Sequence, residues 1–277
     1  MAPPDGTERT IDLAGRTAVV TGGSKGIGLG LARGLAAAGA AVSIWARDEA
    51  TARAAADEIG AHAAVCDVRQ RGDIDRALAE TVAALGPVDV LVTSAGRSSA
   101  LEPFLEMSDE SWHDVLDTNL GGVFRTCQVL GRHMAEHGRG GKMVLLSSLR
   151  VIMGAPVSAD YAASKGGVES MLRCVAMAMA PHGVQVNAIR PGWIRTAMTE
   201  GMWADPAFAA GPPAPIPAAR WGDPVDLAGV VTYLASSASD YHTGDVITVD
   251  GGLTAAAGGG TTGATTAAEP AAAGGSR

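Results

Sequence analysis

Short runs of β-branched and aliphatic residues alternate along the chain with longer stretches in which apolar residues recur at helical spacing. The apolar runs predict seven strands, at Thr17–Thr21, Ala41–Trp45, Ala63–Cys66, Val88–Thr93, Lys142–Ser147, Val184–Ile189 and Val246–Val249. The stretches between them predict helices at Ile27–Ala38, Glu49–Ile59, Ile74–Leu85, Trp112–His137, Ala159–Met179 and Asp226–Ala235, with Asp73 and Ser108 as N-caps. Near-continuous apolar strands that alternate with helices are typical of a parallel sheet covered on both faces. The pattern therefore predicts a single α/β domain with a doubly wound parallel sheet of about seven strands.

Both ends of the chain differ in composition from this central part. Residues 1–10 are polar and contain prolines, and after Leu253 the sequence is rich in alanine, glycine and threonine with no further large apolar residue. A segment of that composition buries too little apolar surface to offset the entropy lost on ordering. We therefore expect a flexible segment at 1–10, a folded domain at 11–252 and a disordered tail at 253–277.

Composition narrows the classes of protein to which this domain can belong. The chain has 277 residues and a formal charge of −8 without runs of basic residues, which disfavours nucleic acid as a partner. No apolar run approaches the roughly 18 residues of a membrane helix, and the first residues have no apolar segment like that of a signal peptide. Three scattered cysteines, Cys66, Cys127 and Cys174, are typical of reduced thiols. We expect a cytoplasmic protein with no nucleic-acid or membrane partner.

A glycine-rich loop follows the first predicted strand and opens the first helix. It runs from Thr21 to Gly28, with glycines at 22, 26 and 28. Glycine lets the backbone turn tightly and approach a pyrophosphate, which then lies at the positive end of the helix. The position of the loop favours a dinucleotide-binding (Rossmann) fold over a purely structural turn. The loop residues expected at the cofactor are Gly22, Ser24, Lys25, Gly26, Ile27 and Gly28.

The end of the second strand indicates which dinucleotide binds. An NAD-selective fold places an acidic residue there, on the ribose hydroxyls. Ala46 stands at that point and Arg47 follows it, so Arg47 and Lys25 can together hold a 2′-phosphate. We expect NADP(H), with NAD(H) as the second choice if Asp48 binds the ribose and Arg47 is only a surface charge.

A phenol and an amine lie four residues apart in the predicted helix at Ala159–Met179. Tyr161 and Lys165 therefore share one face of that helix. A free tyrosine has a pKa near 10, and an ammonium at about 4 Å contributes on the order of 4 kcal/mol at an effective dielectric constant of about 20, which lowers that pKa. We expect Lys165 to make Tyr161 a usable general acid/base. Ser148 ends the fifth strand, at the sheet edge where open α/β folds bind ligands.

Taken together and in this order, the motifs resemble those of the short-chain dehydrogenase/reductase family in its non-extended form, over about residues 11–252. The matching pieces are the loop at 21–28, Asp67 with Val68, Asn119, Ser148, Tyr161 with Lys165, the run Asn187-Ala-Ile-Arg-Pro-Gly192 followed by Thr196, and the segment 243–252. Within the family, the chain is similar both to 3-oxoacyl-[acyl-carrier-protein] reductases and to gluconate or polyol dehydrogenases. The resemblance does not separate these two groups.

The resemblance implies a role for each matching residue. Tyr161 would exchange the proton with the carbonyl or alcohol oxygen, Ser148 would hold that oxygen, and Lys165 would lower the pKa of Tyr161 and bind the nicotinamide ribose. Asn119 would anchor a water that joins Lys165 to a proton relay. Asp67 and Val68 would flank the adenine, Ile194 and Thr196 would hold the carboxamide, and further cofactor contacts would come from Ser94, Ala95, Gly96, Pro191 and Gly192. No metal is required, and members of the family commonly form homotetramers.

One position departs from the family pattern. The segment after the fourth strand reads Thr93-Ser-Ala-Gly96, where the family usually has an asparagine in place of Thr93. The substitution removes an amide that usually ties neighbouring strands. We expect it to affect local rigidity and to leave the catalytic groups intact.

The substrate is the part of the function that the sequence specifies least. Arg97, Arg150 and Met153 are candidates for contact with a polar substrate, and Arg150 can pair with a carboxylate or phosphate or simply face solvent. Residues 196–221 stand where the family has its substrate lid, and Trp193, Met198 and Met202 are candidates for an apolar lining.

The sequence as a whole predicts an oxidoreductase that transfers a hydride between NADP(H) and a carbonyl or secondary alcohol. The two substrate classes are a sugar acid or polyol and a 3-oxoacyl thioester. The alternative is a catalytically silent NADP(H)-sensing protein on the same fold, which a damaged Ser/Tyr/Lys set would indicate. All three residues are present in this chain.

Overall fold

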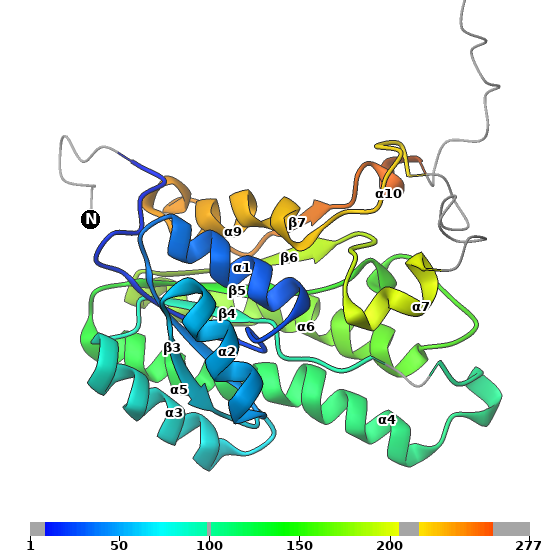
Figure 1. Ribbon diagram of the computed structural model, residues 1–277, viewed down its shortest axis with the longest axis horizontal. Helices are drawn as coiled ribbons and strands as arrows, with labels where there is room; N and C mark the ends of the chain where they lie inside the picture. Colours follow the sequence, from blue (N-terminus) through cyan, green and yellow to red (C-terminus); the bar gives the residue numbers. More distant parts are fainter. Residues whose placement is uncertain (1–8, 99–100, 205–215, 257–277) are drawn as a thin grey trace, which may run out of the picture.

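Seven parallel strands form the centre of the molecule (Figure 1). The computed structural model describes residues 9–98, 101–204 and 216–256. The strands are β1 Thr17–Thr21, β2 Ala41–Ala46, β3 His62–Val65, β4 Val90–Thr93, β5 Gly141–Leu146, β6 Val184–Pro191 and β7 Val246–Val249. They lie in the order β3-β2-β1-β4-β5-β6-β7, and each neighbouring pair is parallel. The predicted doubly wound sheet is confirmed, and its order reverses between β1 and β4, where such sheets open a crevice at the carboxyl ends of the strands.

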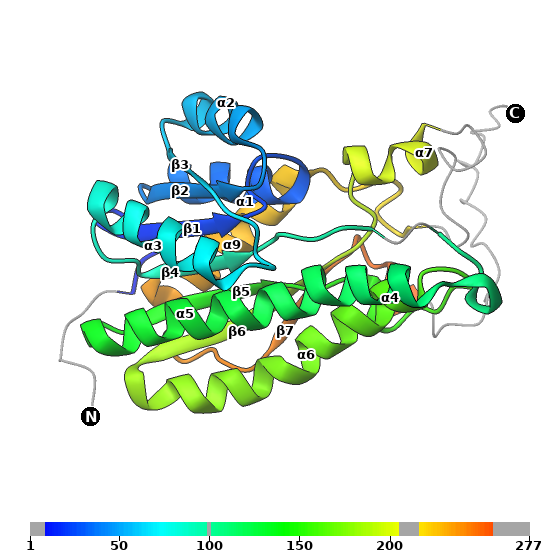
Figure 2. The same cartoon turned by 90° about the horizontal axis from the view of Figure 1, so that it is seen from below.

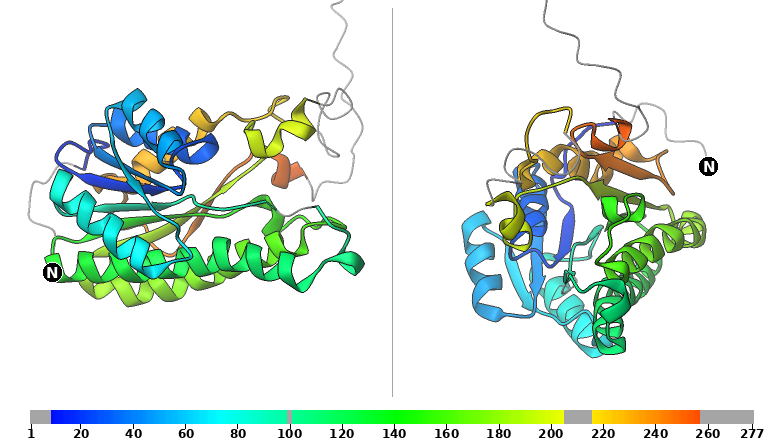
Figure 3. Two further views of the ribbon diagram at one scale, coloured as in Figure 1. Left: turned by 60° about the horizontal axis from the view of Figure 1, so that its bottom comes forward. Right: turned by 90° about the vertical axis from the view of Figure 1, so that its right-hand side faces the viewer.

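Helices cover both faces of the sheet (Figures 2 and 3). The helices are α1 Gly26–Ala37, α2 Glu49–Ile59, α3 Arg71–Leu85, α4 Asp109–Leu116, α5 Gly122–His137, α6 Ala159–Met179, α7 Glu200–Trp203, α9 Ala228–Ala235 and α10 Leu253–Ala256. One apolar cluster joins one face of the sheet to α1, α2 and α9, and a second joins the other face to α3, α5 and α6. None of the helices within the described ranges has both the length and the apolar character needed to cross a bilayer.

The alternation of side chains along the strands explains why these runs are apolar throughout. In β1, Val19 packs into the cluster with α3, α5 and α6, whereas its neighbours Ala18 and Val20 pack into the cluster with α1, α2 and α9. All three side chains are 0% exposed. A strand buried on both faces needs apolar side chains on both sides, so the middle of β1 is a continuous apolar run, and only its two ends are threonines.

The substitution at Thr93 leaves a buried hydroxyl without a partner. Thr93 is 2% exposed, and its Oγ1 has no hydrogen bond to the described residues. Its backbone pairs in register with Thr21 of β1 and Leu145 of β5. The strands are therefore joined here through the main chain alone, and the side chain adds no tie.

The long helix predicted at Trp112–His137 is divided in the structure. It begins earlier, at Asp109, where Ser108 Oγ accepts the N–H of Ser111 at 3.1 Å, which confirms Ser108 as an N-cap. A π-helical turn at Asp117–Gly121 then separates α4 from α5. Such turns mark places where tertiary contacts overrule the regular helix, and they are frequent at functional sites.

The prediction that Asp73 caps a helix is wrong. The helix α3 begins at Arg71 after Gln70, so Asp73 lies in its first turn. Its carboxylate accepts the backbone N–H of Asp67 at 3.1 Å and a guanidinium N–H of Arg76 at 2.9 Å. The side chain of Asp73 thus stabilises the loop after β3 and does not cap the end of its own helix.

Both terminal segments are more ordered at their inner ends than their composition predicts. Leu253 is 0% exposed and begins α10, and Thr254 donates to the Asp250 carboxylate through its N–H at 2.8 Å and its hydroxyl at 2.6 Å. The predicted start of the tail at 253 is therefore wrong, and residues 257–277 lie outside the described residues. At the other end, Arg9 pairs with Asp240 at 3.0 Å, while residues 1–8 of the expected flexible segment lie outside the described residues.

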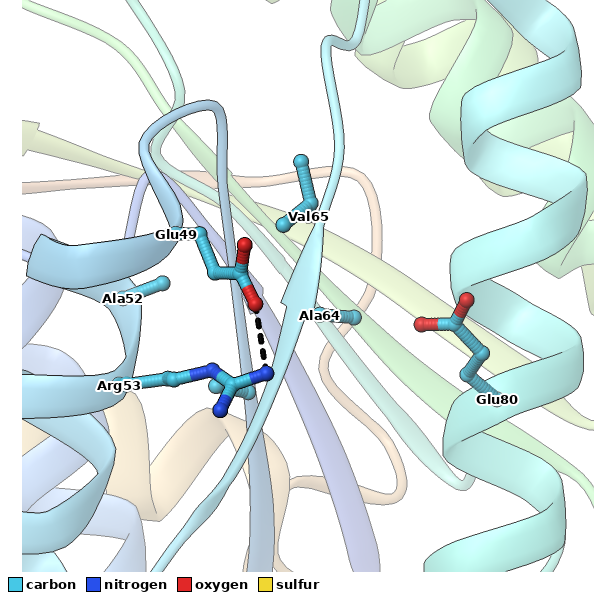
Figure 4. A pocket seen from close by; sticks show the side chains of 7 residues that line it. Glu49, Ala52, Arg53, Ala64, Val65 and Glu80 are labelled. Atoms are coloured by element: carbon cyan, nitrogen blue, oxygen red, sulfur yellow. Dashed lines mark ion pairs between the residues drawn. The ribbon is translucent and has the colours of Figure 1, made fainter.

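A hollow of about 250 Å³ lies on the open edge of the sheet, beside β3 (Figure 4). Glu49 and Arg53, one turn apart on α2, form an ion pair on one side of it, and Glu80 of α3 lies on the opposite side. Both members of that pair are largely exposed, so it contributes little to stability. None of the residues implicated by the sequence in binding or catalysis lines this hollow.

Candidate active site

The glycine-rich loop lies between β1 and α1, against the segment that follows β4. Gly22 has a φ of +66°, and a Cβ on it would lie 2.7 Å from the Cα of Ala95. Gly26 has a φ of +54°, and a Cβ on it would lie 3.3 Å from the Cγ2 of Thr196. Only glycine combines this backbone conformation with so close an approach. The ends of β1, β4 and β6 are thereby brought to one edge of the sheet, where Ser94, Ala95 and Gly96 follow β4 and Thr196 follows β6.

Two basic side chains stand at this edge outside any ion pair among the described residues, although the charge of Arg47 helps to lower the pKa of Asp67. Lys25, at the N-cap of α1, and Arg47, directly after β2, are exposed, and neither forms an ion pair or hydrogen bond through its side chain with a described residue. Asp48 is differently placed, because its carboxylate accepts the N–H of Thr51 at 2.8 Å as the N-cap of α2. That bond lowers the pKa of the Asp48 carboxyl. The carboxylate is engaged in capping, which leaves Arg47 as the group free to meet a ligand.

The segment expected at the adenine follows β3. Arg69 pairs with the Asp67 carboxylate at 2.7 Å, and this bond lowers the pKa of Asp67. Val68 is 6% exposed and packs in the core, where a Cβ on Gly122 would lie 2.5 Å from its Cγ2. The side of this segment open to the sheet edge is therefore Asp67 and its backbone.

Ser148, Tyr161 and Lys165 meet at the carboxyl end of β5. The Ser148 hydroxyl lies close enough to Tyr161 to lower the pKa of its phenol. The Lys165 amine donates to the carbonyl oxygen of Leu146 at 2.8 Å and lies 5.8 Å from the centroid of the Tyr161 ring. Lys165 is 3% exposed, whereas Ser148 and Tyr161 are half-buried. The three residues that the sequence motifs single out thus form one cluster. In it, Ser148 and Tyr161 carry the hydroxyls that a ligand can reach.

The pKa values in this cluster differ from what the Tyr–Lys spacing predicts. Burial raises the pKa of Tyr161, and the hydrogen bond from Ser148 and the charge of Arg150 lower it by less. Burial also lowers the pKa of Lys165 to about 8. Loss of hydration outweighs the neighbouring charges, so the net shift of the Tyr161 pKa is upward, and the lowering of that pKa by Lys165 stays a prediction. At neutral pH Tyr161 is a neutral phenol, the form that donates a proton.

Asn119 joins two elements of the site from the π-helical turn. Its side chain is 0% exposed. Its Oδ1 accepts the backbone N–H of Arg97 at 2.9 Å, and its Nδ2 donates to the Arg97 carbonyl at 3.0 Å and to Ser164 Oγ at 3.2 Å. The amide therefore fastens the segment after β4 to α6 beside Lys165.

Comparison with known proteins agrees with this arrangement. Residues 22–254 match a family model described as enoyl-(acyl carrier protein) reductase. A 5-keto-D-gluconate 5-reductase of Escherichia coli is 38% identical over 246 residues, which cover 87% of this chain and 96% of that protein. The chain belongs to the short-chain dehydrogenase/reductase family. It is therefore an oxidoreductase, and the resemblance that the sequence motifs indicate is confirmed.

Two further members of the family illustrate its range. The 3-oxoacyl-[acyl-carrier-protein] reductase MabA of Mycobacterium tuberculosis is 38% identical over 239 residues, which cover 86% of this chain and 92% of that protein. The structure of a gluconate 5-dehydrogenase from Burkholderia cenocepacia in complex with NADP and tartrate superposes with a TM-score of 0.81 at 37% identity, covering 88% of this chain and 97% of that one. Similar identity to proteins with different substrates means that overall likeness alone does not select a substrate.

The candidates for substrate contact lie in two places. Arg150 lies over the ring of Trp193, with its guanidinium carbon 5.4 Å from the ring centroid, and Met153 packs on the same small apolar cluster as Trp193. Arg97 is exposed and pairs with Asp114 of α4 at 2.6 Å, so its charge is already matched. Arg150 is therefore the stronger of the two arginine candidates.

A hollow of about 260 Å³ opens where β6 and β7 end. Gly192, Trp193 and Ile194 line one side of it, and Pro191 lies just before them at the end of β6. Met198 is 52% exposed, and Met202, on α7, is half-buried. Both follow Ile194 by a few positions in the sequence. Residues 205–215 of the expected lid lie outside the described residues.

A buried ion pair in this family member was missed by sequence reasoning. Arg190 of β6 donates to the Glu169 carboxylate at 2.8 and 2.6 Å, and Ser147, next to Ser148, donates to the same carboxylate. Only 10% of the Glu169 side chain and 16% of the Arg190 side chain are exposed. The signal was present as two charges inside otherwise apolar patterns, one in a helix and one between Ile189 and Pro191 of a strand. The pair joins α6 to the ends of β5 and β6.

Replacing Glu169 with glutamine should destabilise the fold, because it leaves a buried guanidinium without its countercharge. We expect Glu169→Gln to lower the free energy of unfolding by about 3 kcal/mol, measured by urea denaturation. The matched control is Glu58→Gln, which removes the exposed partner of Arg33 and should cost less than about 1 kcal/mol. Equal effects of the two substitutions would contradict the importance given to the buried pair.

Proposed function

We propose that this chain catalyses hydride transfer between NADP(H) and a carbonyl or secondary alcohol group of a small, polar keto or hydroxy compound. The observation that supports this most is the cluster of Ser148, Tyr161 and Lys165 at the end of β5, on the same sheet edge as the glycine-rich loop. A binding protein needs the loop but has no use for a proton donor at this place. The silent sensor is thus the weaker hypothesis.

The residues at the loop suit a dinucleotide that carries a 2′-phosphate. The glycines at 22 and 26 leave the backbone open to a pyrophosphate at the amino end of α1. Lys25 and Arg47 offer unmatched positive charge, and Asp48 is occupied as an N-cap. The gluconate 5-dehydrogenase of B. cenocepacia was solved with NADP, which supports the same choice.

The proposed chemistry divides between the cofactor and the chain. The nicotinamide, when bound, supplies or accepts the hydride. Ser148 holds the carbonyl oxygen, and Tyr161 donates its proton to that oxygen during reduction or accepts one during oxidation. Lys165 uses one N–H on Leu146, and an ammonium has two more donors for a ribose hydroxyl. Because burial raises the pKa of Tyr161, the phenol is in the form that reduction requires. The relay water assigned to Asn119 by the resemblance stays a prediction.

Two substrate classes fit this proposal to different degrees. A 5-keto sugar acid is the first choice, because the 5-keto-D-gluconate 5-reductase of E. coli and the gluconate 5-dehydrogenase of B. cenocepacia are both similar to this chain over most of its length. A 3-oxoacyl thioester is the second, on the identity with MabA. The sequence shows no obvious cluster of lysine and arginine near the entrance for an acidic carrier protein, which favours the sugar acid.

We also propose that the chain forms a homotetramer. Phe124 of α5 is 47% exposed and Met177 of α6 is 77% exposed, so two large apolar side chains face outward from the helix layer that carries Asn119 and Tyr161. Burial of such residues between subunits would remove apolar surface from water.

Replacing Tyr161 with phenylalanine tests the proton donor. Tyr161→Phe should lower kcat/KM for NADPH-dependent reduction of 5-keto-D-gluconate by at least about 100-fold. The dissociation constant for NADPH, measured by fluorescence titration, should stay unchanged. Tyr241→Phe is the control, because Tyr241 is a fully exposed tyrosine. Near-normal turnover by Tyr161→Phe would exclude the mechanism, and tight NADPH binding by a wild type that turns over neither substrate class would favour the sensor.

Replacing Arg47 with alanine tests the choice of cofactor. A guanidinium on a phosphate is a charge-assisted contact, so Arg47→Ala should raise KM for NADPH by about 10- to 100-fold and leave KM for NADH nearly unchanged. Arg53→Ala, on the outer part of α2, is a control of equal charge and should change neither value. A wild type that prefers NADH would show that the unmatched charge of Arg47 does not select the cofactor.

A further inference from the structure

Arg150 is a partly buried arginine whose charge is unmatched. It lies in the turn after Ser148, and only its backbone N–H is engaged, donating to Ser148 Oγ at 3.3 Å. Its guanidinium forms no ion pair or hydrogen bond with any residue that the structure describes. Arg97, Arg190 and Arg220, by comparison, each hold a carboxylate at 2.6 or 2.7 Å. Keeping a charge half out of water without a counterion costs free energy unless a ligand supplies the counterion.

Trp193 fixes where this guanidinium lies. The Arg150 guanidinium carbon is 5.4 Å from the centroid of the Trp193 ring, a cation–π arrangement. Trp193 is itself supported by Trp221, whose ring centroid is 5.4 Å away, and by the apolar cluster of Leu149, Ile216 and Leu253. A guanidinium attracted to an aromatic ring in this way still has N–H groups with which it can bind a carboxylate.

The position of Arg150 places an anion close to the reacting group. The backbone N–H of Arg150 donates to the Ser148 hydroxyl at 3.3 Å, and the charge of Arg150 and the hydroxyl of Ser148 both lower the pKa of Tyr161. A small molecule bound to the guanidinium by one end can therefore present its other end to Ser148 and Tyr161. A substrate that fills both places must have a carbonyl or hydroxyl and a negative group in the same small molecule.

We propose that Arg150, stacked on Trp193, binds the carboxylate of the substrate and so makes the chain select keto and hydroxy acids over neutral ketones. This inference rests on the carbonyl reductase function proposed above. It separates the two substrate classes, because a 3-oxoacyl thioester carries no negative charge on the acyl group that reacts. The paired geometry of carboxylate and guanidinium accounts for the preference.

Two sugars test the subsite because they differ in a single group. In 5-keto-D-gluconate one end of the chain is a carboxylate, and in L-sorbose the same end is a hydroxymethyl group. Initial rates of NADPH oxidation are measured with each sugar for the wild type, Arg150→Met and Arg150→Lys. We expect Arg150→Met to lower kcat/KM for 5-keto-D-gluconate by about 100-fold and that for L-sorbose by less than about threefold. Arg150→Lys should restore part of the loss, since lysine keeps the charge without the planar fork.

Arg132→Met is the matched control for charge and size. Arg132 is exposed on α5, and the adjacent His133 accepts the backbone N–H of Val88 just before β4, so Arg132 lies at the opposite end of the strands. This variant should reduce both sugars as the wild type does. Unchanged melting temperature and NADPH affinity in Arg150→Met would separate a lost contact from a damaged fold.

The outcomes distinguish the subsite from the function on which it rests. Equal losses for both sugars in Arg150→Met, or no loss for either, would overturn the carboxylate subsite while leaving the reductase intact. A wild type that reduces neither sugar but reduces an acetoacetyl thioester would overturn the sugar-acid choice and the subsite together. Turnover of L-sorbose at the same kcat/KM as 5-keto-D-gluconate by the wild type would also contradict the subsite.

Discussion

The attachment of α6 to the carboxyl end of β5 is the constraint on which the site depends. Leu146 and Ser147 at the strand end each form a hydrogen bond with a residue of α6, and the next residue, Ser148, lies close enough to a third to lower its pKa. Their partners are Lys165, Glu169 and Tyr161, which lie one helical turn apart on one face of the helix. Tyr161 meets Ser148 because the two bonds further along the helix leave α6 little freedom to slide or rotate.

Burial at this attachment determines the protonation states of the site. The same packing that fixes Lys165 and Tyr161 removes water from both side chains, which lowers the pKa of Lys165 and raises that of Tyr161. Burial shifts both groups towards their uncharged forms, but with a pKa of about 8 Lys165 is still mostly charged at neutral pH, while Tyr161 is a neutral phenol. The site therefore favours proton donation by Tyr161 near neutral pH, which suits the direction of reduction.

Most of the fold was predictable because buried strands and helix faces require apolar residues at regular positions in the sequence. Strands such as β1 are buried on both faces, and they appear as continuous apolar runs. The cluster of Ser148, Tyr161 and Lys165 was predictable in membership, since the strand end and the helix spacing bring these residues together. Its electrostatics were not, because the pKa of Tyr161 depends on side chains that bury it from other elements. Contacts between distant segments could not be read from the sequence either. Leu253 is the last large apolar residue of the chain, and it packs in a buried cluster with Leu149 and Ile216.

The pH dependence of reduction tests most directly the claim that Tyr161 acts as a neutral acid beside a charged Lys165. The measurement is kcat/KM for 5-keto-D-gluconate at saturating NADPH between about pH 6 and pH 10. We predict that kcat/KM stays constant through neutral pH and falls above about pH 8. At that pH Lys165 loses its proton while Tyr161 keeps its own. A rate that instead rises steadily from pH 6 to above pH 8 would mean that the ionised phenol is the active form, and it would contradict the account.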